Sequence, residues 1–150
     1  EALFEGNTIN TPSLLCTEDY LQALDWAEEC GGYQGLKARS DRSLEILTDW
    51  VAKTDWIEFL CADDDVRSNS GVTLSIVHPT FAKMDEPTQR DFIKRMMKRL
   101  EDEDACFDAN GYAKAPPGLR IWCGATVEPD DVAKLTPWLE WTFAEELAAL

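Results

Sequence analysis

One arginine stands in an apolar segment where its charge calls for an anionic partner. Arg120 lies between Leu119 and Ile121, in a short run that follows the turn-forming sequence Pro-Pro-Gly at residues 116–118. This run is typical of a strand, and a guanidinium is costly to bury there unless an anion pairs with it. Its planar fork matches a carboxylate or a phosphate through two parallel hydrogen bonds. The sequence therefore predicts a site for a small anionic ligand at Arg120.

The charge balance allows a simpler interpretation of the same arginine. The chain has 29 Asp and Glu residues against 14 Lys and Arg, a net charge of −15. Arg120 could therefore pair with an acidic residue of its own domain, or face solvent from a half-exposed strand. The same balance argues against a nucleic-acid or anionic-membrane partner, because no basic stripe is present to neutralise phosphates. On spacing alone, both interpretations of Arg120 stay open.

Asn10 and Thr11 form a second candidate site. Amide and hydroxyl groups hydrogen-bond phosphate oxygens, and a helix N-terminus adds free N–H groups and a positive dipole. The sequence Thr11-Pro12 predicts such a helix start, with Thr11 as the N-cap and Pro12 at the first helical position. On the residues alone, plain helix capping is the simpler explanation. The position therefore predicts either a phosphate contact or a cap.

Lys114 is a third candidate, in the loop that precedes the Arg120 strand. A lysine ammonium can hold a phosphate as a point charge, although a solvated loop lysine fits the same position. Tyr112 could donate a hydroxyl nearby. His78, the only histidine, lies outside any nucleophile motif and is predicted to be structural. No residue pattern predicts a metal site.

The elements that must position these residues follow from hydrophobic periodicity. The pattern predicts strands over about 56–61 and 71–78 and through Arg120, and helices over about 12–30, 33–53 and 87–103 and from 129 onward. Because strands and helices do not alternate strictly, the pattern predicts an α+β fold. We expect a small, mainly antiparallel sheet with helices packed on one face.

Composition places the chain among globular domains with an ordinary core. Five cysteines, an odd number without CxxC spacing, favour a reducing cytoplasm over a disulfide framework or a zinc site. No apolar run approaches the roughly 18 residues of a membrane span, and no signal peptide is evident. The chain begins at Glu1 rather than at Met, which suggests a piece of a longer protein.

Two long motifs and several short ones resemble a known enzyme family. The chain resembles the C-terminal part of the phosphoserine aminotransferases along nearly its whole length, through residues 4–13, 25–27, 49–54, 67–70, 112–128 and 135–141. The resemblance implies the small domain of a fold-type I aminotransferase at residues 32–150. Residues 1–31 would then be an interface arm and helix from the end of the large domain.

The resemblance also implies roles for the candidate residues. Arg120 corresponds to the arginine that grips the substrate carboxylate. Asn10 and Thr11 correspond to a pair that reaches across a homodimer interface to the phosphate of pyridoxal phosphate on the other subunit. Lys114 lies where some members carry a His-Arg pair that contacts the substrate phosphate. The sequence here is Ala113-Lys114, and this departure weakens the phosphate assignment.

The implied activity is transfer of an amino group between glutamate and 3-phosphohydroxypyruvate, in serine biosynthesis. The cofactor would be pyridoxal phosphate. None of the seven lysines matches the one that forms the Schiff base in this family, so we expect the segment alone to be inactive and to lack bound cofactor. Two alternatives stay open: another fold-type I aminotransferase, and a free-standing, non-catalytic binding or regulatory domain with the same fold.

Overall fold

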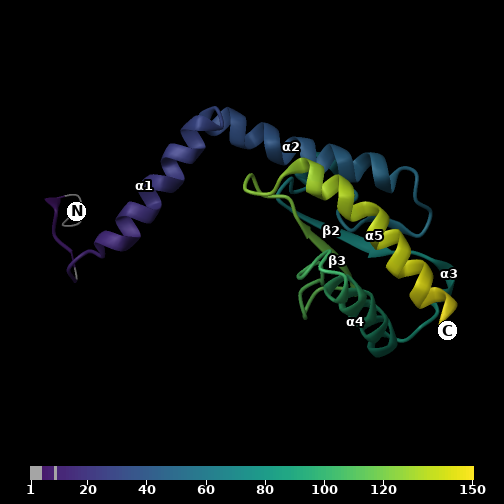
Figure 1. Ribbon diagram of the computed structural model, residues 1–150. Helices are drawn as coiled ribbons and strands as arrows, with labels where there is room; N and C mark the ends of the chain where they lie inside the picture. The colour runs from purple at the N-terminus through teal and green to yellow at the C-terminus, as the bar shows by residue number, and fades with distance from the viewer. Residues whose placement is uncertain (1–4, 9) are drawn as a thin grey trace. The chain divides into compact units, whose positions relative to one another are not determined.

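The structure, a computed structural model, describes residues 5–8 and 10–150 (Figure 1). Phe4 and Ile9 of the opening motif therefore lie outside the described residues. The chain divides after Leu36 into two units. The first contains α1 (Leu14–Glu29) and the start of α2 (Gly32–Val51), and the second contains the remaining elements. The predicted boundary between residues 31 and 32 stays a prediction.

Helix α1 begins later than the sequence predicted. Ser13 is the N-cap, and its Oγ accepts a hydrogen bond from the backbone N–H of Cys16 at 3.3 Å. The prediction that Thr11 caps the helix is therefore wrong, because the hydroxyl that reaches the first turn belongs to Ser13. At the other end, Gly31 and Gly32 have φ angles of +95° and +64°. Glycine adopts such angles without steric cost, so the pair ends α1 as predicted.

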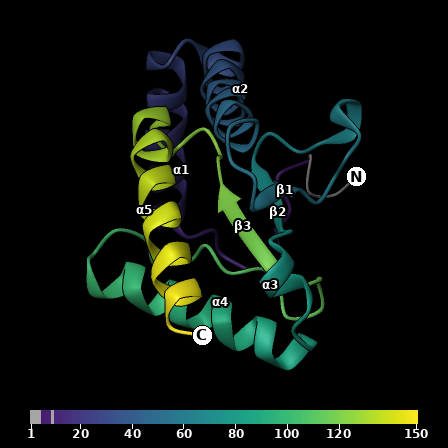
Figure 2. The same ribbon diagram turned by 90° about the vertical axis from the view of Figure 1, so that its right-hand side faces the viewer.

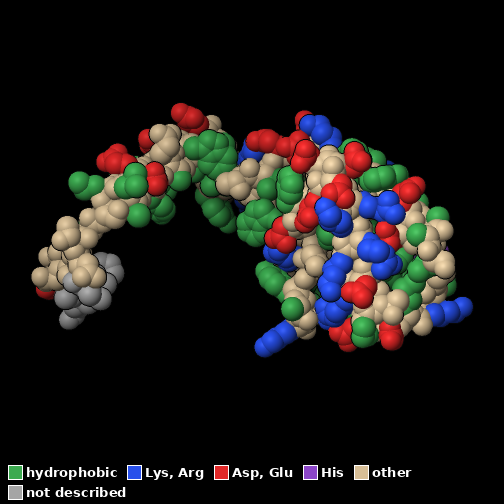
Figure 3. Space-filling model, turned by 60° about the horizontal axis from the view of Figure 1, so that its bottom comes forward, with side chains coloured by type: hydrophobic (Ala, Val, Ile, Leu, Met, Phe, Trp, Pro, Cys, Tyr) green, Lys and Arg blue, Asp and Glu red, His purple; other side chains and the backbone are tan. Residues whose placement is uncertain are grey.

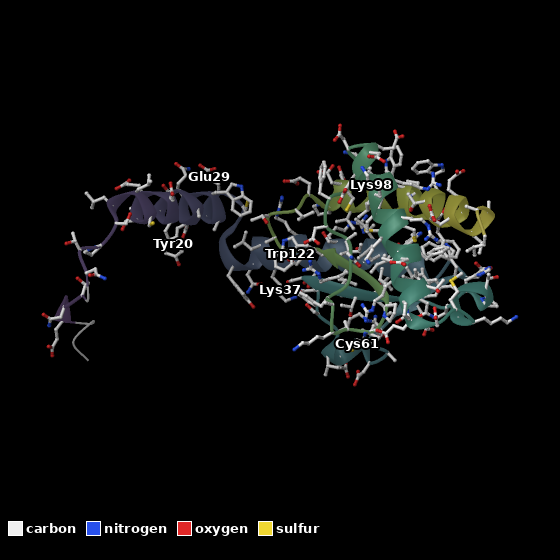
Figure 4. The ribbon with its side chains drawn as sticks, turned by 90° about the horizontal axis from the view of Figure 1, so that it is seen from below. Tyr20, Glu29, Lys37, Cys61, Lys98 and Trp122 are labelled. Atoms are coloured by element: carbon white, nitrogen blue, oxygen red, sulfur yellow. The ribbon has the colours of Figure 1, made fainter. Side chains whose placement is uncertain are left out.

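Apolar side chains cover much of the surface of α1. None of its described residues is buried, and its exposed large hydrophobics are Leu14, Leu15, Tyr20, Leu21 and Leu24. Figure 3 shows hydrophobic side chains along this helix. Tyr20 and Glu29 project from opposite sides of it (Figure 4), as nine residues at about 100° each require. None of the described residues of the first unit is buried, and α1 presents an apolar surface.

The second unit is built on a three-stranded antiparallel sheet in the order β1-β2-β3. The strands are β1 (Ile57–Phe59), β2 (Gly71–Ile76) and β3 (Gly118–Trp122). In the β2–β3 register, Leu119 faces Leu74 and Arg120 faces Thr73. The predicted α+β fold with a small antiparallel sheet is confirmed.

One face of this sheet carries the core. Its inward side chains alternate along the strands and are Val72, Leu74 and Ile76 of β2 and Leu119 and Ile121 of β3. Helices α2, α4 (Glu86–Asp102) and α5 (Pro129–Ala148) all contribute to the same buried cluster, and Figure 2 shows α4 and α5 beside the sheet. Short α3 (Pro79–Ala82) and the 3-10 turn Asp64–Val66 were not predicted.

Aromatic rings fill the space where α5 meets the sheet. Trp56 and Phe143 stack with centroids 4.0 Å apart, and Phe92 of α4 meets Phe143 edge-on at 5.8 Å. The indole N–H of Trp50 donates to Glu140 Oε1 at 2.8 Å. These contacts bury large surfaces and satisfy the polar end of Trp50, so they fix α2 and α5 against β1.

A buried carboxylate joins α4 to α5. The side chain of Glu146 is 3% exposed, and it accepts hydrogen bonds from Arg95 Nε at 2.5 Å and Arg99 Nε at 2.7 Å. Burial by itself would raise the pKa of Glu146. The hydrogen bonds from Arg99 and Arg95 outweigh burial, so the pKa lies below its usual value and the group stays ionised.

Candidate carboxylate-binding site

Strand β3 presents Arg120 on the sheet face opposite the core. Leu119 and Ile121 point inward and are buried, so Arg120 between them must project outward. Trp122 (Figure 4) follows on the same side and is more than half exposed. The strand begins at Gly118, where a Cβ would lie 2.2 Å from the carbonyl oxygen of Leu74. Glycine is therefore required for β3 to pair with β2 at this point.

The edge of β3 that does not face β2 pairs with a short segment of the connection between α4 and β3. The N–H of Arg120 donates to the carbonyl oxygen of Ala109 at 2.9 Å, and Asn110 forms an isolated bridge with Leu119. This pairing places Asp108 beside the guanidinium of Arg120. Sequence reasoning missed Asp108, because nothing in a loop twelve residues upstream signals a strand pairing.

Two side chains hold the guanidinium of Arg120. Nη2 donates to Asp108 Oδ2 at 2.8 Å, and Nη1 lies 3.4 Å from the hydroxyl of Tyr112. The guanidinium carbon also lies 4.6 Å from the centre of the Tyr112 ring, within the range of a cation–π contact. Arg120 Nε is buried and has no hydrogen-bond partner within the described part of the chain. One donor of the fork is therefore left unsatisfied.

Burial is unequal across the Arg120–Asp108 pair. The side chain of Arg120 is 18% exposed, and that of Asp108 is 77% exposed. The structure thus shows the pairing with an acidic residue that the sequence left open. An acid this exposed is held weakly, since surface ion pairs contribute about 0–1 kcal/mol. The anion-binding role of Arg120 stays a prediction, and the geometry is compatible with a ligand that takes the place of Asp108.

Lys114 lies in the exposed loop between the Asn110 bridge and β3. It is exposed and has no ion pair among the described residues.

Arg90 of α4 fixes this loop, because its Nη2 donates to the carbonyl oxygen of Ala115 at 2.8 Å and to Glu86 at 2.6 Å. Beside the loop is a cavity of about 210 Å³, lined by Arg90, Lys94, Asn110, Gly111, Pro116 and others. Arg90 was not predicted, since only the tertiary contact assigns it this role.

Asn10 and Thr11 belong to the first unit, whereas Arg120, Lys114 and Tyr112 belong to the second. Both residues are exposed and precede the Ser13 cap. Neither side chain hydrogen-bonds another described residue, so their donors are available to a ligand. Their predicted contact with a cofactor phosphate stays a prediction.

His78 has a structural role, as predicted. Its Nδ1 accepts a hydrogen bond from the N–H of Thr80 at 3.3 Å and caps α3, while its ring meets Phe143 at 5.5 Å.

Among the helices of the described chain, none is long and apolar enough to cross a bilayer.

Comparison with known proteins places these features in a family context. No protein-family model matches the chain. The chain is 41% identical over 141 residues to a phosphoserine aminotransferase of Methanosarcina mazei and 42% identical over 141 residues to that of Methanosarcina barkeri. Each match covers 94% of this chain and 35% of the relative. The chain therefore spans about a third of the length of these curated relatives.

Solved structures give the same result for the fold. A phosphoserine aminotransferase from Bacillus circulans subsp. alkalophilus superposes with a TM-score of 0.75 at 20% identity, over 96% of this chain and 36% of that one. A second, from a study of radiation damage to its Schiff base, gives 0.74 at 15% identity, over 96% and 37%. The fold is shared, and the resemblance that the motifs indicated is confirmed over nearly the whole chain.

Proposed function

We propose that this chain is the C-terminal segment of a phosphoserine aminotransferase, which transfers an amino group between glutamate and 3-phosphohydroxypyruvate in serine biosynthesis. The similarity to the Methanosarcina enzymes across almost the whole chain carries the proposal. The five cysteines are free thiols, which supports a cytoplasmic enzyme. The complete enzyme would be a homodimer, and the apolar surface of α1 supports an interface at this end of the chain.

Arg120 is the residue that we assign to the carboxylate shared by both amino-acid substrates. Its side chain is 18% exposed on the sheet face opposite the core, it lies against the ring of Tyr112, and its counter-ion is exposed. A guanidinium on a side chain with little exposed surface binds a carboxylate more strongly than one on a fully solvated side chain. Lys114 is assigned to the phosphate of phosphoserine, as an exposed cation on the neighbouring loop.

The residues present fit a phosphate-bearing cofactor in part. Asn10 and Thr11 offer amide and hydroxyl donors without competing partners among the described residues, and we assign them to the phosphate of pyridoxal phosphate on the other subunit. When bound, pyridoxal phosphate supplies the electron sink for transfer of the amino group. This chain's own residues would orient the substrate by its carboxylate and anchor the cofactor by its phosphate.

The lysine that binds the cofactor covalently is, in this proposal, outside the chain. Such a lysine must be desolvated so that its amine is neutral and nucleophilic. All seven lysines here are exposed. Lys98 and Lys134 have pKa values raised by hydrogen bonds to Asp102 and Asp131, which is opposite to what the reaction needs. These observations support a segment that is inactive and cofactor-free by itself.

The test is Arg120→Ala in the complete enzyme that contains this chain. Losing a desolvated, charged hydrogen-bond pair should weaken substrate binding by on the order of 2–4 kcal/mol. The KM values of glutamate and phosphoserine should rise together, because both substrates carry the carboxylate, while the absorbance of bound cofactor persists. Lys114→Ala should raise only the KM of phosphoserine.

Arg42→Ala is the matched control, since Arg42 is an exposed helix residue paired with Glu45. An unchanged KM for glutamate in Arg120→Ala would refute the assignment of the carboxylate site. Activity on serine or alanine in place of phosphoserine would favour another fold-type I aminotransferase. A complete reading frame that encodes no large domain would favour the non-catalytic binding domain.

A further inference from the structure

We infer that Asp108 is a displaceable counter-ion of Arg120: it occupies the guanidinium while the site is empty and yields it to the carboxylate of the ligand. The identity of that ligand rests on the proposed function, but the contact between Asp108 and Arg120 does not. Asp108 would thus set how tightly the site holds any carboxylate. It lies outside the core, with its side chain 77% exposed, and Arg120 is the residue with which it forms an ion pair.

The access routes to the fork support this inference. A carboxylate binds a guanidinium through two adjacent N–H groups. Arg120 Nε is buried against the protein, so a ligand cannot use that edge of the fork as it stands. The remaining donors are Nη1 and Nη2. Nη1 makes only a long contact of 3.4 Å to Tyr112, while Nη2 is engaged by Asp108 at 2.8 Å.

The electrostatics point the same way. A ligand carboxylate that reaches Nη1 and Nη2 comes within a few ångströms of the Asp108 carboxylate, and two like charges at that distance repel. Asp108 can leave at little cost, because its side chain is 77% exposed and it bonds the guanidinium through one oxygen only. Arg120 itself cannot follow, since its side chain is 18% exposed and lies against the Tyr112 ring. The cation is therefore fixed and the anion exchangeable.

The experiment compares Asp108→Asn with the unmodified 150-residue chain, using sodium acetate at constant ionic strength as the probe. Acetate offers one carboxylate and no amine or phosphate, so its effect on the Arg120 signal reports carboxylate binding at this site. Binding is followed through the arginine Nε–Hε signals in NMR spectra, and the Arg120 signal is assigned by its loss in Arg120→Lys. Removing the competing charge should tighten acetate binding about threefold.

Asp104→Asn is the matched control. It removes the same charge from the same loop region without a contact to Arg120, and asparagine tolerates the φ of +55° found there. Asp104→Asn should leave the acetate affinity unchanged. Equal or weaker binding in Asp108→Asn, or the absence of a saturable shift in that variant, would overturn the inference.

The outcome is separable from that of the proposed function. If Arg120→Ala leaves the substrate KM values unchanged while Asp108→Asn tightens acetate binding, the substrate assignment fails and the counter-ion inference stands. The reverse pattern, with raised KM values and no gain in Asp108→Asn, keeps Arg120 as the carboxylate residue and makes Asp108 a fixed part of its support.

Discussion

Two arginine–carboxylate clusters in the second unit are built in opposite ways. Between α4 and α5, the acid is buried: Glu146 is 3% exposed, whereas Arg95 and Arg99 are 50% and 36% exposed. On the open face of the sheet the cation is the less exposed partner, since Arg120 is 18% exposed and Asp108 is 77% exposed. In the first cluster the fold buries the acid, whereas in the second it buries more of the cation.

This reversal separates a structural cluster from a candidate binding site. Glu146 receives two charge-assisted hydrogen bonds from two arginines and cannot leave without opening the α4–α5 contact. Arg120 makes a single hydrogen bond to its exposed counter-ion Asp108 beside its contacts with Tyr112, and its buried Nε has no partner in the described chain. An ion pair with one solvated member and an unsatisfied donor contributes little to folding and leaves a charge available for a ligand.

Glu146→Ala should have the largest effect on stability. It removes a buried carboxylate that satisfies two arginines, so we expect a loss of about 2–3 kcal/mol, at the low end for a buried pair because the arginines remain partly solvated. Urea unfolding of the 150-residue chain measures this loss. Glu145→Ala is the matched control, since Glu145 is half exposed and lies 3.9 Å from Arg99. Equal losses in both variants would show that the burial of Glu146 is not what matters.

Acid should weaken the same cluster selectively. Because the pKa of Glu146 is lower in the folded chain than its usual value of 4.5, its contribution is present above that value and is lost as pH falls through the folded pKa. The difference in unfolding free energy between wild type and Glu146→Gln should therefore shrink below about pH 4.5. A difference that stays constant down to the acid transition would contradict the depressed pKa.

Arg120→Leu should change stability least. Its counter-ion is exposed and one of its donors is unsatisfied, so removing the charge should cost no more than about 1 kcal/mol in urea unfolding. This small effect would contrast with the large effect of Arg120→Ala on substrate KM. A loss as large as that of Glu146→Ala would erase the distinction between the two clusters and make Arg120 structural.

Much of the architecture followed from local pattern. The apolar repeats of α2 and α4 predicted both helices to within about two residues, because a buried stripe at helical spacing leaves few other conformations. Alternation in β2 predicted its inward side chains. The cap of α1 was misplaced, because Thr11-Pro12 and Ser13 both offer a plausible start and only the backbone geometry selects Ser13. Helix α3 has four residues, too few for any period to show.

The sequence by itself determined that an arginine stands at position 120 within a strand. Leu and Ile on either side of it force its guanidinium onto the outer face of the sheet. Tertiary structure alone decided its neighbours. Asp108 reaches it through pairing of the free edge of β3, and Tyr112 reaches it through a loop that Arg90 of α4 holds. Local periodicity fixes which way a side chain points, whereas its partners depend on contacts between segments that the sequence does not place side by side.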